Sequence, residues 1–215
     1  MLVLAHTGIT LGTAVLLAGA LTARHLSKAT RNEATTSSQH SPQRILLPLS
    51  SAVHRASSLL ISLANLADVR LLMFGALLSD IIDKPLGLLL FRETLASGRI
   101  FGHTLLFLVL IVVTGFYLYR RHKKTWLLIL SFGTFMHLIL DQMWQTPQTL
   151  FWPLFGFAFL REDTTNWIPN IFHALVTKPE VYLPELMGAV IIVWFAWILL
   201  QRKKVYYFIK WGQVQ

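Results

Sequence analysis

The chain reads TWLLILSFGTFMHLILDQMW at residues 125–144, an apolar run long enough to cross a bilayer. Two ionisable side chains, His137 and Asp141, lie within it, four residues apart and therefore on one face of a helix. An ionised group in hydrocarbon costs several kcal/mol unless a partner compensates it, so such residues usually mark a site. We interpret this stretch as a membrane helix that contributes to a functional site.

The composition indicates an integral membrane protein. Of the 215 residues, 54% are hydrophobic and 13% are charged, whereas a soluble domain carries about 25% charged residues. The net charge is +9, but the basic residues gather in short runs beside apolar segments, at 120–124 and 202–204. Runs of this kind are typical of cytoplasmic flanks of membrane helices and argue against nucleic-acid binding. The absence of cysteine excludes disulfides and thiolate metal sites.

The hydropathy pattern predicts an all-α, polytopic helical bundle that forms a single membrane-embedded domain, residues 1–215. About five transmembrane helices are expected, four of them long and apolar: 2–23 (a retained anchor), 103–119, 125–144 and 181–200. The fifth, within 69–90, is read as a short helix from Val69 to Asp83 followed by a turn at Lys84-Pro85.

The remaining segments are expected to lie outside the bilayer core or at its surface. They are a polar loop at 24–44, an amphipathic interfacial helix at 45–67, a re-entrant or interfacial segment at 146–157 and a polar loop at 161–180. The excess of Lys and Arg in 24–70, 120–124 and 201–215 predicts a cytoplasmic C-terminus and an outside N-terminus, in a cell (inner) membrane.

This orientation brings the intramembrane polar residues to one side of the bilayer. The residues are His6, Asp80, Asp83, His103, His137 and Asp141. A divalent cation is the simplest partner that keeps Asp80 and Asp83, three residues apart on one helix face, both ionised. Mixed imidazole and carboxylate ligands favour zinc or manganese. Arg99 is a candidate partner for an anionic group such as a phosphate.

Less specific interpretations of single residues stay open. Asp80 with Lys84 is also explained as an ion pair at a helix end, and His6 as an interfacial residue. Glu185 is taken as solvated or interfacial.

At these residues the chain resembles the YdjM-like family of inner-membrane proteins, described as predicted membrane-bound metal-dependent hydrolases. The matching elements are, in order, His6; LLSDIIDKP at 77–85; GRIFGHT at 98–104; His137 with Asp141; Thr146-Pro147; and Trp152-Pro153. Two departures stand out, because Lys84 and Gly98 occupy positions where the family pattern has histidine. The carboxylate block also carries one extra residue, which places its second aspartate at Asp83.

The resemblance implies a hydrolase, and the site at the outer interface suits an ester or phosphoester of a lipid-like substrate. Asp80, Asp83 and Arg99 are then the catalytic candidates, and the six His and Asp residues the metal candidates. A cation or proton transporter or channel that uses the same cluster is the alternative from another class. A non-catalytic membrane scaffold is the third. The oligomeric state and the substrate stay open.

Overall fold

The computed structural model describes residues 3–36, 68–157, 159–160 and 167–212. The chain divides into two compact units, residues 1–11 with 67–215 and residues 12–66. All candidate site residues belong to the first unit.

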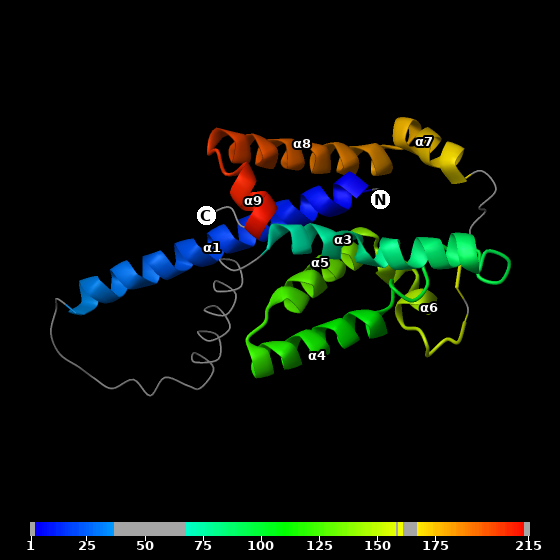
Figure 1. The fold of residues 1–215 in the computed structure, drawn as a ribbon, viewed down its shortest axis with the longest axis horizontal. Helices are drawn as coiled ribbons and strands as arrows, with labels where there is room; N and C mark the ends of the chain where they lie inside the picture. The colour runs from blue at the N-terminus through cyan, green and yellow to red at the C-terminus, as the bar shows by residue number, and fades with distance from the viewer. Residues whose placement is uncertain (1–2, 37–67, 158, 161–166, 213–215) are drawn as a thin grey trace. The chain divides into compact units, whose positions relative to one another are not determined.

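Regular structure in the described residues is entirely helical, which confirms the predicted fold class (Figure 1). The helices are α1 (Val3–Thr36), α3 (Val69–Lys84), the π-helical η1 (Pro85–Leu90), α4 (Leu105–His122), α5 (Trp126–Leu140), the 3₁₀ turn η2 (Met143–Gln145), α6 (Pro147–Leu150), α7 (Trp167–Thr177), α8 (Pro179–Gln201) and α9 (Val205–Trp211).

Three of the described helices are long and apolar enough to cross a membrane, namely Val3–Ala20 within α1, α4 and α8. α5 is apolar but has only 15 residues, which corresponds to a rise of about 23 Å against a hydrocarbon core of about 30 Å. α3 has 16 residues, but η1 follows it without a break, so this helical segment runs from Val69 to Leu90. The protein is therefore a helical membrane bundle in which one of the five expected spans, α5, is shorter than the bilayer core.

The first helix extends beyond its predicted end. The polar loop was expected to begin at residue 24, but α1 continues to Thr36. The segment 24–36 contains Ala, Leu, Lys, Arg and Glu, which favour helix, and its Ser, Thr and Asn residues do not outweigh them. Residues 37–44, like the predicted amphipathic helix at 45–67, lie outside the described residues.

The turn expected at Lys84-Pro85 is also wrong. Pro85 has helical dihedral angles, φ −62° and ψ −40°, and opens η1, which ends where the Phe91 N–H donates to the Leu86 carbonyl at 2.8 Å. A proline is tolerated at the start of a helical segment because its fixed φ suits helix and its missing N–H is not needed there.

The polar loop predicted at 161–180 contains the helix α7, and α8 begins at Pro179. Pro179 stands in the first turn of α8, a position that proline favours. α9 was not predicted. The segment 143–157 consists of η2, α6 and turns, as its proline and glycine content indicates.

Small residues bring α3 and α5 close together. A Cβ atom at Gly133 would lie 2.5 Å from the Leu72 carbonyl oxygen, and one at Gly75 would meet the Leu130 carbonyl. At this contact the Thr134 hydroxyl donates to the Gly75 carbonyl at 3.2 Å. α4 and α5 form an antiparallel pair (Figure 1), with Gly115 of α4 packed on Leu128. This packing holds the C-terminal ends of α3 and α5 side by side.

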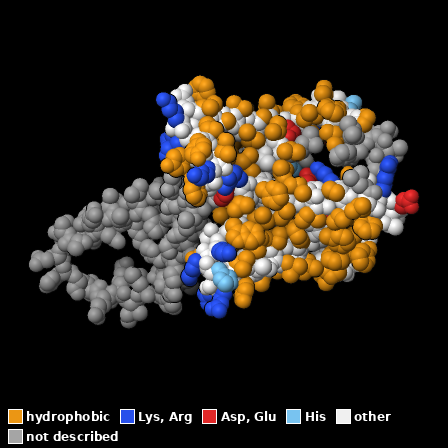
Figure 2. All heavy atoms as spheres, in the orientation of Figure 1, with side chains coloured by type: hydrophobic (Ala, Val, Ile, Leu, Met, Phe, Trp, Pro, Cys, Tyr) orange, Lys and Arg blue, Asp and Glu red, His pale blue; other side chains and the backbone are white. Residues whose placement is uncertain are grey.

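Large apolar side chains cover much of the molecular surface (Figure 2). The exposed residues of α4 and α8 include Leu110, Val113, Val190, Val193 and Trp197. An apolar surface of this extent is unfavourable in water but suits lipid acyl chains. The buried interior is, by contrast, unusually polar, because His6, Asp83, His103 and His137 are all fully buried.

Candidate metal centre

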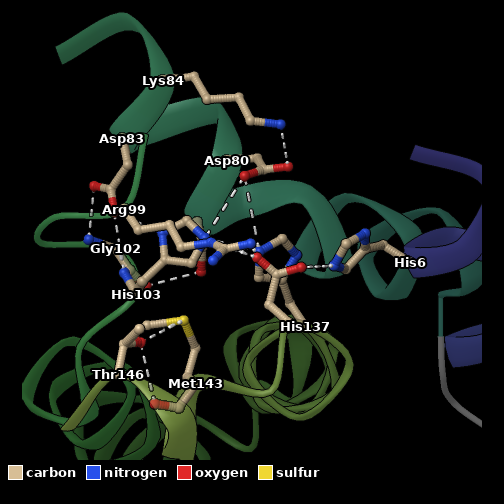
Figure 3. A network of polar contacts seen from close by, with 12 residues as sticks. His6, Asp80, Asp83, Lys84, Arg99, Gly102, His103, His137, Met143 and Thr146 are labelled. Atoms are coloured by element: carbon tan, nitrogen blue, oxygen red, sulfur yellow. Dashed lines mark hydrogen bonds and ion pairs between the residues drawn. The ribbon is translucent and has the colours of Figure 1, made fainter. Parts of the chain in front are cut away.

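Four segments place polar side chains in one cluster (Figure 3). α1 contributes His6, α3 contributes Asp80 and Asp83, the irregular segment 97–104 contributes Arg99 and His103, and the end of α5 contributes His137 and Asp141. The structure thus brings together every residue that the sequence singled out for the site.

The hydrogen bonds of His137 determine which of its nitrogens faces the cluster. Its Nδ1 lies 2.6 Å from the Ala76 carbonyl oxygen on α3. A carbonyl can only accept, so Nδ1 carries the proton. In a neutral imidazole the other nitrogen, Nε2, is then an unprotonated acceptor.

His103 is oriented in the same way by Asp83. Its Nδ1 lies 2.7 Å from Asp83 Oδ2, and because a carboxylate only accepts, Nδ1 carries the proton and donates this hydrogen bond. The Nε2 atoms of His103 and His137 face each other at 3.1 Å. Two unprotonated nitrogens at this distance repel each other, so the pair requires a cation or a shared proton between them.

Asp83 organises the loop that carries His103. Its carboxylate accepts backbone N–H bonds from Ile100 at 2.8 Å, Gly102 at 2.7 Å and His103 at 3.1 Å. Glycine at position 102 leaves room for this close approach, because a Cβ would lie 3.0 Å from the Ser79 carbonyl oxygen and 3.1 Å from Asp83 Oδ1. With the His103 ring as a fourth donor, Asp83 has no oxygen directed at the other imidazole, and it belongs to neither group of atoms that could hold an ion.

Asp80, His103 and His137 form one group of candidate ligands. Asp80 Oδ1 lies 3.6 Å from His103 Nε2 and 3.9 Å from His137 Nε2. Four-coordinate zinc with bonds of about 2.0–2.1 Å has ligand atoms separated by about 3.3–3.4 Å. The three observed separations, 3.1, 3.6 and 3.9 Å, bracket this value, so these residues fit a divalent ion with only small adjustments.

His6, His137 and Asp141 form a second group that shares His137 with the first. His6 Nε2 lies 3.0 Å from Asp141 Oδ1, and the His6 ring stacks on His137 with centroids 4.1 Å apart. Asp141 Oδ2 accepts from Arg99 Nε at 3.0 Å and lies 3.7 Å from His103 Nε2. Asp141 therefore links the buried imidazoles to Arg99.

Two contributors were missed by sequence reasoning. The Ala76 carbonyl that orients His137 has no side-chain signature. Glu185, taken as solvated or interfacial, is buried in α8, where it accepts the Leu4 N–H of α1 at 3.1 Å. Its place inside the apolar predicted span 181–200 was the one sequence feature that could have indicated a buried partner for Glu185.

Comparison with known proteins identifies the family. The sequence model of the YdjM inner membrane protein family matches residues 1–205, nearly the whole chain, so the chain belongs to this family. No curated protein and no solved structure matches it. The family resemblance seen in the motifs is thereby confirmed, as is the inner-membrane location that the family name states.

Proposed function

Since the chain is a member of the YdjM inner membrane protein family, we propose that it is a metal-dependent hydrolase of an ester or phosphoester in a lipid-like substrate. The observation that carries the proposal is the contact between His103 and His137, whose Nε2 atoms lie 3.1 Å apart. In each of these residues the Nδ1 atom is hydrogen-bonded to an oxygen acceptor. Metal-ligating histidines are oriented by such second hydrogen bonds.

The residues have separate roles in this proposal. Asp80, His103 and His137 hold the ion, with His6 and Asp141 able to complete its coordination. Zinc is the first choice and manganese the second, because the set mixes imidazole with carboxylate. Asp83 orients His103 instead of binding the ion, since its oxygens already receive three N–H bonds and the His103 ring.

A divalent ion bound here would supply Lewis-acid activation of a water molecule and of a phosphoryl or acyl oxygen. A carboxylate beside the imidazoles would accept the proton of the attacking water, since Asp80 and Asp141 each place an oxygen near His103 Nε2, at 3.6 and 3.7 Å. Arg99 holds the anionic part of the substrate and keeps Asp141 in position through its Nε. The buried imidazoles exclude bulk water from the far side of the site.

The membrane setting suggests an amphiphilic substrate. With the N-terminus outside and the C-terminus cytoplasmic, as the basic residues predict, the cluster lies at the outer interface of a single membrane-embedded domain. An amphiphile can present its head group there while its tail stays among the apolar surfaces of the helices.

A second candidate, proton or cation transport, draws on the same contact. A proton shared between His103 and His137 would also relieve the repulsion of their Nε2 atoms, and buried His and Asp residues are expected in proton relays. Proton uptake into protein-containing liposomes, measured with a pH-sensitive dye, tests this candidate directly.

Metal content decides between these proposals. Protein purified in detergent and dialysed against zinc or manganese should hold a stoichiometric ion, measured by plasma mass spectrometry. His137→Ala and Asp80→Ala should lower the bound metal at least tenfold, whereas His173→Ala, at an exposed position of α7, should leave it unchanged. Wild-type protein that holds neither ion would refute the hydrolase proposal.

A further inference from the structure

The charged side chains of the site point to the class of substrate. Resting on the hydrolase proposal, we infer that the scissile group is a phosphoester and not a carboxylic ester, and that Arg99 and Lys84 bind its phosphate.

Exposure increases in one direction across the cluster. The side chain of His103 is 0% exposed and that of Asp141 4%, whereas Asp80 is 13%, Lys84 32% and Arg99 36% exposed. Figure 2 shows blue and red side chains in a hollow of the otherwise apolar face. A ligand therefore meets the two cations before it reaches the imidazoles.

Lys84 and Arg99 are each bonded to an aspartate that lies near the buried His103 ring. Lys84 Nζ donates to Asp80 Oδ2 at 2.7 Å, and Arg99 Nε donates to Asp141 Oδ2 at 3.0 Å. The two carboxylates each place an oxygen near His103 Nε2, at 3.6 and 3.7 Å. Each cation is thus one carboxylate away from the same imidazole, as Figure 3 shows for Lys84 above Asp80.

Both cations also keep donors for a ligand. Arg99 uses only Nε of its guanidinium for hydrogen bonds within the described part of the chain, which leaves the two Nη groups. Lys84 Nζ donates to one carboxylate and has two further protons. A guanidinium edge and an ammonium group match the several acceptor oxygens of a phosphate.

The charge of the site favours an anion. Among the side chains of the cluster, the carboxylates of Asp80, Asp83 and Asp141 outnumber the two cations by one, which gives a side-chain charge of −1 with neutral histidines. A divalent ion changes this to +1. A carboxylic ester is neutral and leaves that charge uncompensated in a largely buried site, whereas a phosphoester carries at least one negative charge and neutralises it.

Lys84 stands where the resemblance places a histidine. The substitution exchanges a potential ligand for a permanent positive charge beside Asp80. Its effect is to add anion binding at the mouth of the site.

Binding of inorganic phosphate tests the inference without catalysis. Calorimetry on the zinc-loaded, detergent-solubilised protein should show phosphate binding that the metal-free protein lacks, and zinc affinity should rise equally when phosphate is present, since such coupling is reciprocal. Arg99→Gln and Lys84→Gln should each weaken phosphate binding about tenfold or more. Arg121→Gln, in the last turn of α4, and Lys124→Gln, between α4 and α5, change exposed cations and are the matched controls; they should change it less than about twofold.

Arg99→Lys guards against misfolding of the glutamine variant, because it keeps a charge for Asp141. It loses the planar guanidinium edge and should still bind phosphate more weakly than wild type. Zinc-loaded protein that binds no phosphate, or that binds it equally well in both Arg99 variants and in Lys84→Gln, would overturn the inference.

Two chromogenic amphiphiles with the same leaving group distinguish the bond that is cleaved. Octyl p-nitrophenyl phosphate should be hydrolysed in a zinc-dependent manner, whereas p-nitrophenyl nonanoate should not. Zinc-dependent cleavage of the nonanoate at an equal or higher rate would overturn the inference and leave the hydrolase proposal standing. A protein that binds no zinc and cleaves neither compound contradicts both.

Discussion

The cluster has two parts that are held together very differently. Asp80, Asp83, His103 and His137 come from residues 69–141 and are fixed by many short hydrogen bonds around Asp83 and by the close contact of α3 with α5. His6 comes from α1, which is fastened to α8 by the bond from the Leu4 N–H to Glu185 and by contact of Gly8 with Gly188. Many contacts hold the first part in place, whereas few contacts hold the second. Variants in each part should therefore fail differently.

Asp83→Asn should have the largest effect. The amide keeps one acceptor oxygen but presents its NH₂ group to the donors on the other side, which are left unpaired in a buried site. We expect this to cost about 3–5 kcal/mol and to abolish metal binding. Thermal unfolding in detergent and metal content measure the two effects. Glu93→Gln, at an exposed position, is the control. Normal stability and metal content in Asp83→Asn would contradict the assigned role of the Asp83 carboxylate.

Two glycine-to-valine substitutions, one in each part of the cluster, compare the two parts directly. Gly133→Val forces α5 away from the Leu72 carbonyl, and Gly188→Val forces α8 away from the Leu4 carbonyl. Each should destabilise the protein by about 1–3 kcal/mol. Only Gly133→Val should also lose the metal, because Gly188→Val leaves Asp80, His103 and His137 in place. Equal metal loss in both variants would show that the two parts are not separable.

Glu185→Gln is a milder change in the second part. It keeps the side-chain shape and removes the charge that accepts the Leu4 N–H, for an expected loss of about 1 kcal/mol. Metal affinity should fall no more than in His6→Ala, and the double variant should be no worse than His6→Ala alone. Additive losses in titrations with zinc would mean that Glu185 does not act through α1.

The smallest effect is expected at Asp68, which caps α3 away from the cluster. Partial burial acts to raise the pKa of its carboxyl, but hydrogen bonds from Arg70 outweigh it, so the pKa lies below its ordinary value. A depressed pKa means that the pair stabilises the fold above the unfolded-state pKa, near 4, and that this is lost as the pH falls through the folded value. Arg70→Gln should cost less than about 1 kcal/mol at pH 7. The stability difference between variant and wild type should narrow in acid to the part due to the Arg70 bond to the Ile209 carbonyl, which does not depend on Asp68. A difference that does not narrow would exclude the ion pair as a contributor.

The sequence was sufficient to predict which side chains meet. The spacing of His137 and Asp141 predicts that both lie on one helix face. The distribution of basic residues predicts an orientation in which His6 and both aspartates of α3 lie on the same side of the bilayer. The role of Asp83 could not be predicted, because its partners are backbone N–H groups of the loop 97–104, whose conformation has no residue pattern. The orientation of His137 was hidden for the same reason, since its partner is the carbonyl of Ala76.

The errors in the fold have a related origin. Polar composition suggested a loop at 24–44, yet residues of high helix propensity extend α1 to Thr36. Proline suggested a turn at Pro85, yet Pro85 takes the first position of η1, where proline is favourable. Glu185 was misjudged because its partner, the Leu4 N–H, lies 181 residues away in the chain. Long-range pairing of this kind is visible only in three dimensions.

The hydrogen bonds from segment 97–104 to Asp83 determine where the chain can change in length without displacing His103. Insertion or deletion within 97–104 would shift Ile100, Gly102 or His103 out of register with a carboxylate that binds all three. Within the described residues, the Asp83 carboxylate accepts no hydrogen bond from the preceding stretch, 91–96. A change of length there would therefore leave these three bonds in register, whereas a change within 97–104 would not.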